Sequence, residues 1–135
     1  MLTSKCIHPD IIRVLSLCGH GDKILIADGN YPLASRSGDA EKVYLGITPG
    51  MPSVTDVLAS LQSIANFERA EVMQPDGDSE PEIFTEFRSL LDNMELEKLG
   101  RYEFYDACST PTVCLAISTG EKRTFANILL TLGCA

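Results

Sequence analysis

Basic residues are scarce in this chain of 135 residues, where eleven Lys and Arg face nineteen Asp and Glu, giving a formal net charge of −8 at pH 7. An acidic domain repels the phosphates of nucleic acids and anionic lipid headgroups. Long apolar runs are also missing, since none approaches the roughly 18 residues that a bilayer span needs. The N-terminal decapeptide MLTSKCIHPD has no apolar signal core. We therefore expect a cytoplasmic protein that binds neither nucleic acid nor membranes.

No C-x-x-C pair occurs among the five cysteines, so the spacing of a zinc site or of a dithiol redox motif is absent. The number of cysteines is odd, and their neighbours are apolar, as in Val113-Cys114-Leu115. Both features are typical of small buried side chains in a reducing compartment. We expect free thiols at all five positions, which are Cys6, Cys18, Cys108, Cys114 and Cys134.

Several catalytic motifs are also absent. Neither phosphate-binding loop, G-x-x-x-x-G-K-[ST] or G-x-G-x-x-G, occurs, and there is no G-x-S-x-G nucleophile elbow. His8 and His20 are the only histidines, and no H-E-x-x-H or E-x-x-H arrangement joins them. We therefore expect no metal and no nucleotide cofactor. Proton transfer without a covalent intermediate, or simple binding, is the chemistry that these absences leave open.

The composition is that of a globular protein, with 44% hydrophobic and 22% charged residues. A chain of this length buries roughly two-thirds of its surface on folding, so we expect a single domain over residues 1–135 with one core. Apolar residues at helical spacing predict helices over residues 9–17, 53–64 and 84–91, the second opened by the capping pair Ser53 and Asp56. Short apolar runs predict strands over residues 23–28, 43–47, 70–73, 102–105, 112–117 and 126–132. The alternation predicts an α/β fold, a three-layer sandwich of helices around a central sheet.

His20 is the most suggestive single residue, because it lies between Gly19 and Gly21 just before a predicted buried strand. Loops on rigid scaffolds often carry functional side chains. An imidazole titrates near neutral pH, so it can both accept and return a proton, as a general acid-base catalyst must. The alternative is a histidine packed at the end of the preceding helix, where the helix dipole favours it.

Three further polar residues flank the predicted strands. Asp28 ends the strand that follows His20, where its carboxylate can bind an imidazole or sugar hydroxyls, or can simply form the Asp-Gly-Asn turn. Asn127 lies in an apolar strand and needs a partner for its amide, unless it caps the preceding turn. Tyr105 either belongs to the core or places its hydroxyl at the edge of the sheet.

These segments together resemble the RbsD/FucU family of sugar mutarotases, which contains L-fucose mutarotase and D-ribose pyranase. The resemblance covers nearly the whole chain and is specific as a combination of short motifs. The motifs are G-H-G-D at 19–22, A-D-G-N-Y-P at 27–32, G-M-P-S at 50–53, R-Y-E-F-Y at 101–105, T-G-E at 119–121 and N-I-L-L at 127–130.

The resemblance implies interconversion of the anomers of a reducing monosaccharide without cofactor or metal. It implies that His20 transfers the proton and that a set of other residues binds the sugar, namely Asp28, Met73, Arg101, Tyr105, Phe125 and Asn127. One of these departs from the family pattern, since both branches usually carry Tyr where this chain has Phe125. A phenyl ring can stack on the apolar face of a sugar but cannot donate a hydroxyl proton.

The motifs also bear on the substrate and the assembly. Gly21-Asp22, Asn30-Tyr31-Pro32 and Tyr105 resemble the fucose branch, whereas residues 47–53 resemble the ribose branch. We rank L-fucose first, with D-ribose or another aldose as the alternative. A sugar-binding oligomer without catalytic activity is a further alternative, motivated by Phe125. The resemblance also implies a ring-shaped homo-oligomer, typically a decamer, with the sugar bound near subunit contacts.

Overall fold

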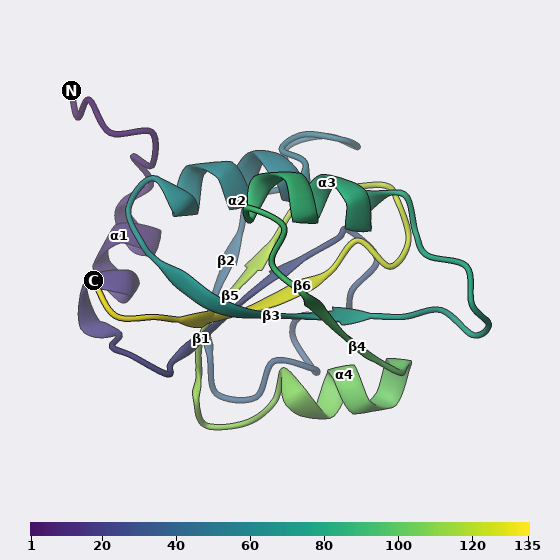
Figure 1. Cartoon of the computed structure of the whole chain (residues 1–135). Helices are drawn as coiled ribbons and strands as arrows, with labels where there is room; N and C mark the ends of the chain where they lie inside the picture. The colour runs from purple at the N-terminus through teal and green to yellow at the C-terminus, as the bar shows by residue number, and fades with distance from the viewer.

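The computed structural model describes all 135 residues and contains four helices and six strands (Figure 1). In chain order these are α1 (Pro9–Leu17), β1 (Lys23–Ala27), β2 (Glu41–Tyr44), α2 (Val54–Gln62), β3 (Phe67–Met73), α3 (Ile83–Leu90), β4 (Leu96–Leu99), α4 (Arg101–Ala107), β5 (Val113–Ser118) and β6 (Ile128–Leu132). None of the helices has the length and apolar character needed to cross a membrane.

The six strands form one mixed sheet in the order β2-β5-β1-β6-β3-β4. Strand β6 is antiparallel to both of its neighbours, β1 and β3, while every other pair is parallel. The carboxyl ends of β1, β3 and β4 therefore meet the amino end of β6 along one side of the sheet, which we call the carboxyl edge. The opposite side, which we call the amino edge, joins the amino ends of β1 and β3 to the carboxyl end of β6.

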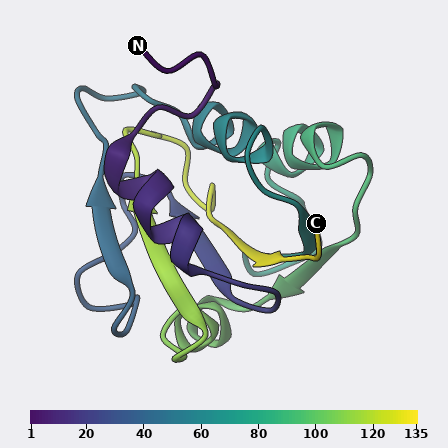
Figure 2. The ribbon, with the colours of Figure 1, turned by 90° about the vertical axis from the view of Figure 1, so that its left-hand side faces the viewer.

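Two apolar clusters cover the two faces of this sheet. Helices α1, α2 and α3 pack on one face over a cluster of 23 buried residues, and Figure 2 shows α1 crossing in front of β5. Helix α4 and the segment after β1 cover the other face over a cluster of 11 residues, which includes the fully buried Phe104. Strand side chains alternate between the clusters, as Ile24 and Ile26 face one while Leu25 and Ala27 face the other. The predicted three-layer α/β sandwich is confirmed.

Helix α1 has the predicted bounds, and the predicted capping box at the start of α2 is present. The Ser53 hydroxyl accepts a hydrogen bond from the Asp56 amide at 3.1 Å, and the Asp56 carboxylate accepts one from the Ser53 amide at 3.0 Å. Residues 30–40 and 74–82, for which no helix or strand is predicted, also lie outside the helices and strands. Strong local signals thus located most of the elements.

The strand predicted over residues 102–105 is wrong, because this segment is helical and belongs to α4. Tyr102 and Phe104 would share one face of a strand but lie on nearly opposite sides of a helix, and in the structure Phe104 is buried while Tyr102 is exposed. Gly100 is the N-cap residue of this helix, and the rings of Tyr102 and Tyr105 lie one turn apart, with centroids 6.1 Å apart. Strand β4, which pairs with β3 at the end of the sheet, was not predicted.

The prediction of five free thiols is wrong for two of them. Cys18 and Cys114 form a disulfide, with Cα atoms 7.0 Å apart, while Cys6, Cys108 and Cys134 are free. The two paired residues are separated by 96 positions in the sequence. They meet because Cys18 ends α1, and α1 packs against β5, which carries Cys114. Such a contact depends on tertiary packing and leaves no spacing pattern in the sequence.

Candidate active site

A pocket of about 170 Å³ opens at the carboxyl edge of the sheet. The structure brings together there all six residues that the sequence analysis assigned to sugar binding, and three others line the same pocket. Its lining consists of Asp28, Asn30, Tyr31, Met73, Arg101, Tyr105, Thr124, Phe125 and Asn127. The topology explains this meeting: Asp28 follows β1, Met73 ends β3, Arg101 follows β4 at the start of α4, and Asn127 directly precedes β6.

Asp28 and Asn127 form the polar floor of the pocket, and both are almost fully buried. The Asp28 backbone N–H donates to Asn127 Oδ1 at 2.8 Å, and Asn127 Nδ2 donates to Asp28 Oδ2 at 3.1 Å. The Asn30 N–H donates to Asp28 Oδ1 at 2.9 Å, and the Ala126 N–H donates to Oδ2 at 3.2 Å. Asp28 therefore shapes the turn and also holds the residue that faces it across the sheet.

Burial raises the pKa of the Asp28 carboxyl above its ordinary value, because the ionised form loses its hydration. The hydrogen bonds from the amides of Asn30 and Ala126, and from the Asn127 side chain, oppose this shift, since they stabilise the carboxylate. The result is a carboxyl group held rigidly at the base of a small pocket. Its position suits it to accept hydrogen bonds from the hydroxyls of a small polar ligand.

Two tyrosines form one wall. The rings of Tyr31 and Tyr105 meet edge to face with centroids 5.4 Å apart, and the Tyr31 hydroxyl donates to the carbonyl of Arg36 at 2.8 Å. The Arg36 guanidinium carbon lies 5.1 Å from the centre of the Tyr105 ring, within range of a cation–π contact. Burial raises the pKa of the Tyr31 phenol, so that this hydroxyl stays protonated and serves as a donor.

Phe125 forms another wall of the pocket and has a strained backbone conformation. Its φ of 58° lies in the left-handed region, which is rare for a bulky side chain. The Arg101 guanidinium carbon lies 5.8 Å from the centre of the Phe125 ring. The next amide, that of Ala126, is bonded to Asp28, so the backbone turn that strains Phe125 also completes the polar floor. Strain of this kind is concentrated at ligand sites in other proteins.

His20 is not in this pocket. It precedes β1 and lies at the amino edge, where its Nε2 is 2.9 and 3.0 Å from the two carboxylate oxygens of Glu68. The five residues of β1 alone separate it from Asp28 by about 16 Å. Its side chain is 56% exposed and borders a groove of about 930 Å³ between the two chain termini, α1 and the end of α2. His20 is thus exposed and not packed against the end of α1, while its role in proton transfer stays a prediction.

Sequence reasoning left three lining residues unassigned, namely Asn30, Tyr31 and Thr124. The first two follow Asp28 within three positions, and Thr124 directly precedes Phe125. Adjacency in sequence to a proposed ligand-binding residue on a loop was therefore the signal that could have identified them.

Comparisons with known proteins find relatives over the whole length of the chain. The model of the RbsD / FucU transport protein family matches residues 1–135. The D-ribose pyranase of Paracidovorax citrulli is 30% identical over 140 residues, covering 98% of each chain, and that of Shouchella clausii is 34% identical over 127 residues, covering 92% of this chain and 91% of that protein.

Solved structures show the same likeness in three dimensions. Bacillus subtilis RbsD complexed with D-ribose matches with a TM-score of 0.86 at 27% identity, and the fucose mutarotase of Streptococcus pneumoniae in complex with L-fucose matches with a TM-score of 0.83 at 25% identity. Each comparison covers 100% of this chain and 99% of the other. The resemblance seen in the short motifs thus extends to the whole fold. The chain belongs to the RbsD/FucU family.

Proposed function

We propose that this protein is a mutarotase that interconverts the anomers of a reducing monosaccharide without a cofactor. The observation that carries the proposal is the pocket at the carboxyl edge, which also has aromatic side chains in its lining. Its buried Asp28 carboxylate and buried Asn127 amide are held in place by hydrogen bonds between these two residues. Polar groups on the floor and rings on the sides suit a sugar, which presents hydroxyls around its ring and an apolar face. The family relatives named D-ribose pyranase and fucose mutarotase support this assignment.

The reaction asks little of the protein beyond positioning and proton transfer. The anomeric hydroxyl loses a proton, the bond between C1 and the ring oxygen breaks to give an open-chain carbonyl, and the ring oxygen gains a proton. Rotation about the C1–C2 bond and reclosure then give the other anomer, with no net change in protons. A positioned acid-base group contributes on the order of 10²- to 10⁴-fold to such a step. Asp28 and Asn127 hold the hydroxyls, and Phe125 packs against an apolar part of the sugar.

His20 is the proposed proton-transfer residue, and its place at the amino edge means that it cannot serve the pocket of its own chain. A second copy supplies it, when the amino edge of one copy docks on the carboxyl edge of the next. Such a contact joins two different surfaces, and repeated contacts of this kind form a ring when the rotation between successive copies closes. This arrangement supports the ring-shaped homo-oligomer, a decamer by resemblance, with each pocket completed by its neighbour.

L-Fucose is the substrate ranked first. Met73 and Phe125 line the pocket with apolar surface, which can receive the methyl group of a 6-deoxyhexose, and Tyr105 matches the fucose branch. D-Ribose is the alternative, supported by the names of the sequence relatives and by residues 47–53. Ribose has no methyl group for these side chains to contact.

A sugar-binding protein without catalysis is a second candidate, because two observations favour it. Phe125 lacks the hydroxyl that the family usually provides at this position, and the imidazole lies outside the pocket within one chain. In this case the polar floor would bind the sugar, and its anomers would exchange no faster than in buffer.

Saturation-transfer NMR on L-fucose and D-ribose at neutral pH tests the proposal. We expect faster exchange between anomers in the presence of the protein, with a larger effect on L-fucose, and no acceleration by an Asn127→Ala variant that remains folded. Saturable binding without acceleration would select the second candidate. Neither binding nor acceleration with any aldose would overturn both.

A further inference from the structure

Glu121 is a buried carboxylate that the proposed reaction does not use. Only 6% of its side chain is exposed, and it does not line the sugar pocket. It belongs to the T-G-E turn that follows β5, on the chain segment that continues to Phe125 and Asn127. Buried carboxylates are costly unless they are paired and fully hydrogen bonded, so the contacts of this one are informative.

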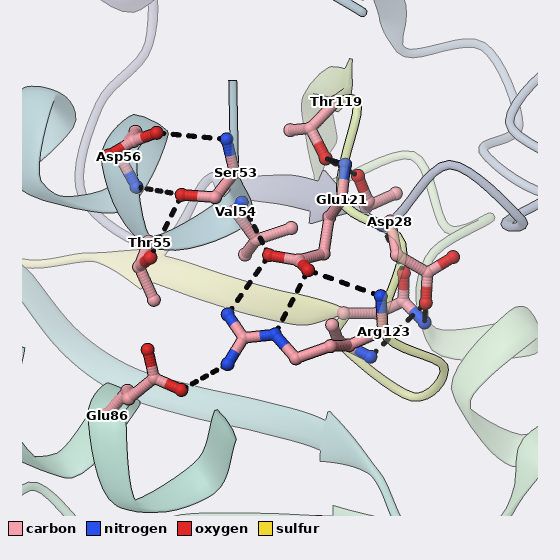
Figure 3. A network of polar contacts seen from close by, with 12 residues as sticks. Asp28, Ser53, Val54, Thr55, Asp56, Glu86, Thr119, Glu121 and Arg123 are labelled. Carbon is pink, nitrogen blue, oxygen red and sulfur yellow. Dashed lines mark hydrogen bonds and ion pairs between the residues drawn. The ribbon is translucent and has the colours of Figure 1, made fainter. Parts of the chain in front are cut away.

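The carboxylate of Glu121 binds α2 directly and is linked to α3 through Arg123 (Figure 3). Its Oε2 accepts from the backbone N–H of Val54, the first residue of α2, at 3.3 Å, and from Arg123 Nη2 at 3.1 Å. Its Oε1 accepts from the backbone N–H and the Nε of Arg123 at 3.2 and 3.0 Å. Arg123 Nη1 in turn pairs with Glu86 of α3.

The backbone of Glu121 contacts the turn that follows β1 and carries Asp28. Its carbonyl accepts the Gly29 N–H at 2.9 Å, directly after Asp28, and its N–H donates to the Thr119 hydroxyl at 3.2 Å. That hydroxyl donates to the carbonyl of Ala27 at 2.8 Å. A Cβ atom on Gly29 would lie 3.1 Å from the Glu121 carbonyl oxygen, which shows how closely the two turns pack.

We propose that Glu121 is the positioning residue of the sugar pocket, because its carboxylate and backbone together hold the Asp28 turn and the Phe125 wall at a fixed separation. The inference rests on the proposed function for its readout. The side-chain contacts fix Arg123, two residues before the strained Phe125, and the backbone contact fixes the turn that presents the Asp28 carboxylate. Removing the carboxylate charge of Glu121 therefore lets the Phe125 wall move relative to the Asp28 turn, although Glu121 itself does not contact the sugar.

The variant Glu121→Gln tests this. The glutamine keeps one acceptor oxygen but removes the negative charge whose two oxygens bind the Arg123 guanidinium. The T-G-E turn remains anchored through Gly120, whose N–H donates to the Pro52 carbonyl at 2.9 Å, so the variant should still fold. Small misplacements of bound groups can cost on the order of 100-fold in rate, and we expect kcat/KM for anomer exchange to fall about tenfold, chiefly through KM.

Glu80→Gln is the matched control, because Glu80, like Glu121, is a carboxylate held by cationic side chains, in this case Arg88 and Lys98. It lies in the loop between β3 and α3, outside the sugar pocket, so its loss should lower the thermal midpoint and leave kcat/KM unchanged. Comparable losses of kcat/KM in both variants would overturn the proposal, since they would indicate general softening of the fold. A Glu121→Gln variant with wild-type KM and kcat would overturn it as well.

Two further measurements keep the outcome decisive. If Glu121→Gln does not fold, Arg123→Lys keeps the positive charge but loses the forked contact, and we expect the same rise in KM at a smaller size. If the wild type accelerates no anomer exchange, the proposed function fails by itself, and sugar affinity measured by titration replaces KM. Equal affinity of Glu121→Gln and wild type would then overturn the positioning role separately.

Discussion

The two ends of strand β1 differ sharply in how they hold their functional residue. At the carboxyl end Asp28 is 2% exposed and its carboxylate accepts three hydrogen bonds from neighbouring segments. At the amino end the side chain of His20 is 56% exposed and has one partner, Glu68. The groups proposed to bind the sugar are thus fixed within one chain, whereas the group proposed to move the proton is left accessible to another. This difference supports the two proposals, that sugar binding is preorganised within one chain and that the catalytic group is shared between copies.

The variant His20→Ala is the strongest test of this difference between the two ends of β1. If binding and proton transfer reside at opposite ends of β1, this change lowers kcat for anomer exchange by about 100-fold or more, the usual range for a positioned acid-base group. The affinity for the sugar should stay within a few-fold of the wild type. Saturation-transfer NMR over a range of sugar concentrations gives both numbers, and circular dichroism confirms the fold.

Mixing two inactive variants tests whether the proton group comes from another copy. His20→Ala and Asn127→Ala subunits, dissociated and reassembled together at equal amounts, should regain about a quarter of the wild-type activity, because a random heterologous contact pairs an intact His20 with an intact pocket at that frequency. Mixtures that stay inactive after reassembly would contradict the sharing of the site.

How far the sequence predicts this arrangement depends on the range of the interactions involved. The helical spacing from Pro9 and the Ser53 capping box are local, and they gave helices with the correct starts. The sequence also shows that His20 and Asp28 flank one strand, which implies that the two residues lie at opposite edges of the sheet. The antiparallel direction of β6 could not be predicted from the sequence, because a fully buried strand has the same apolar run in either direction.

The errors have the same origin. The pairing of Cys18 with Cys114 depends on where α1 crosses the sheet, which no local pattern records. Four residues ending at Tyr105 are too few to separate a helical period from a strand period, and the helix was missed. The strain at Phe125 arises because the chain must present the Ala126 amide to Asp28, which only the folded geometry reveals.

At the carboxyl end, Asp28→Asn should abolish measurable sugar binding or weaken it by more than tenfold. An Asn side chain presents only one acceptor oxygen, so it cannot serve the Asn30 amide, the Ala126 amide and the Asn127 side chain as the carboxylate does. Isothermal titration measures the affinity. A variant that binds sugar as tightly as the wild type would contradict the assignment of Asp28 to the binding floor.

The same variant gives a pH test with a definite sign. Because burial raises the pKa of native Asp28 above the unfolded value of about 3.9, the native state holds this proton more tightly than the unfolded state. The free energy of unfolding of the wild type, relative to Asp28→Asn, should therefore fall as the pH rises from about 4 through the native pKa, and become constant above it. Urea unfolding at several pH values measures this difference, and an increase with pH would contradict it.

A smaller effect is expected from Phe125→Tyr, which sharpens the comparison at the binding end. The added hydroxyl restores a hydrogen-bond donor to the wall of the pocket without changing the ring. We expect kcat/KM for L-fucose to rise a few-fold, on the order of one net hydrogen bond. Tyr105→Phe, which removes a hydroxyl from the wall formed by the two tyrosines, is the matched control and should lower kcat/KM. A fall on adding the hydroxyl would show that the pocket is shaped for an apolar group at this position.

The smallest effect belongs to Glu68→Gln at the amino end. His20 and Glu68 are both about half exposed, and exposed pairs of this kind contribute between 0 and about 1 kcal/mol, so the exchange rate should change by no more than about fivefold. Glu97→Gln, which removes the exposed partner of Arg69, provides a control for charge alone. If His20 must leave Glu68 to enter a neighbouring pocket, weakening the pair can only help that step or leave it unchanged. A tenfold loss would instead mean that Glu68 holds the imidazole in its working orientation, and the amino end would then be as preorganised as the carboxyl end.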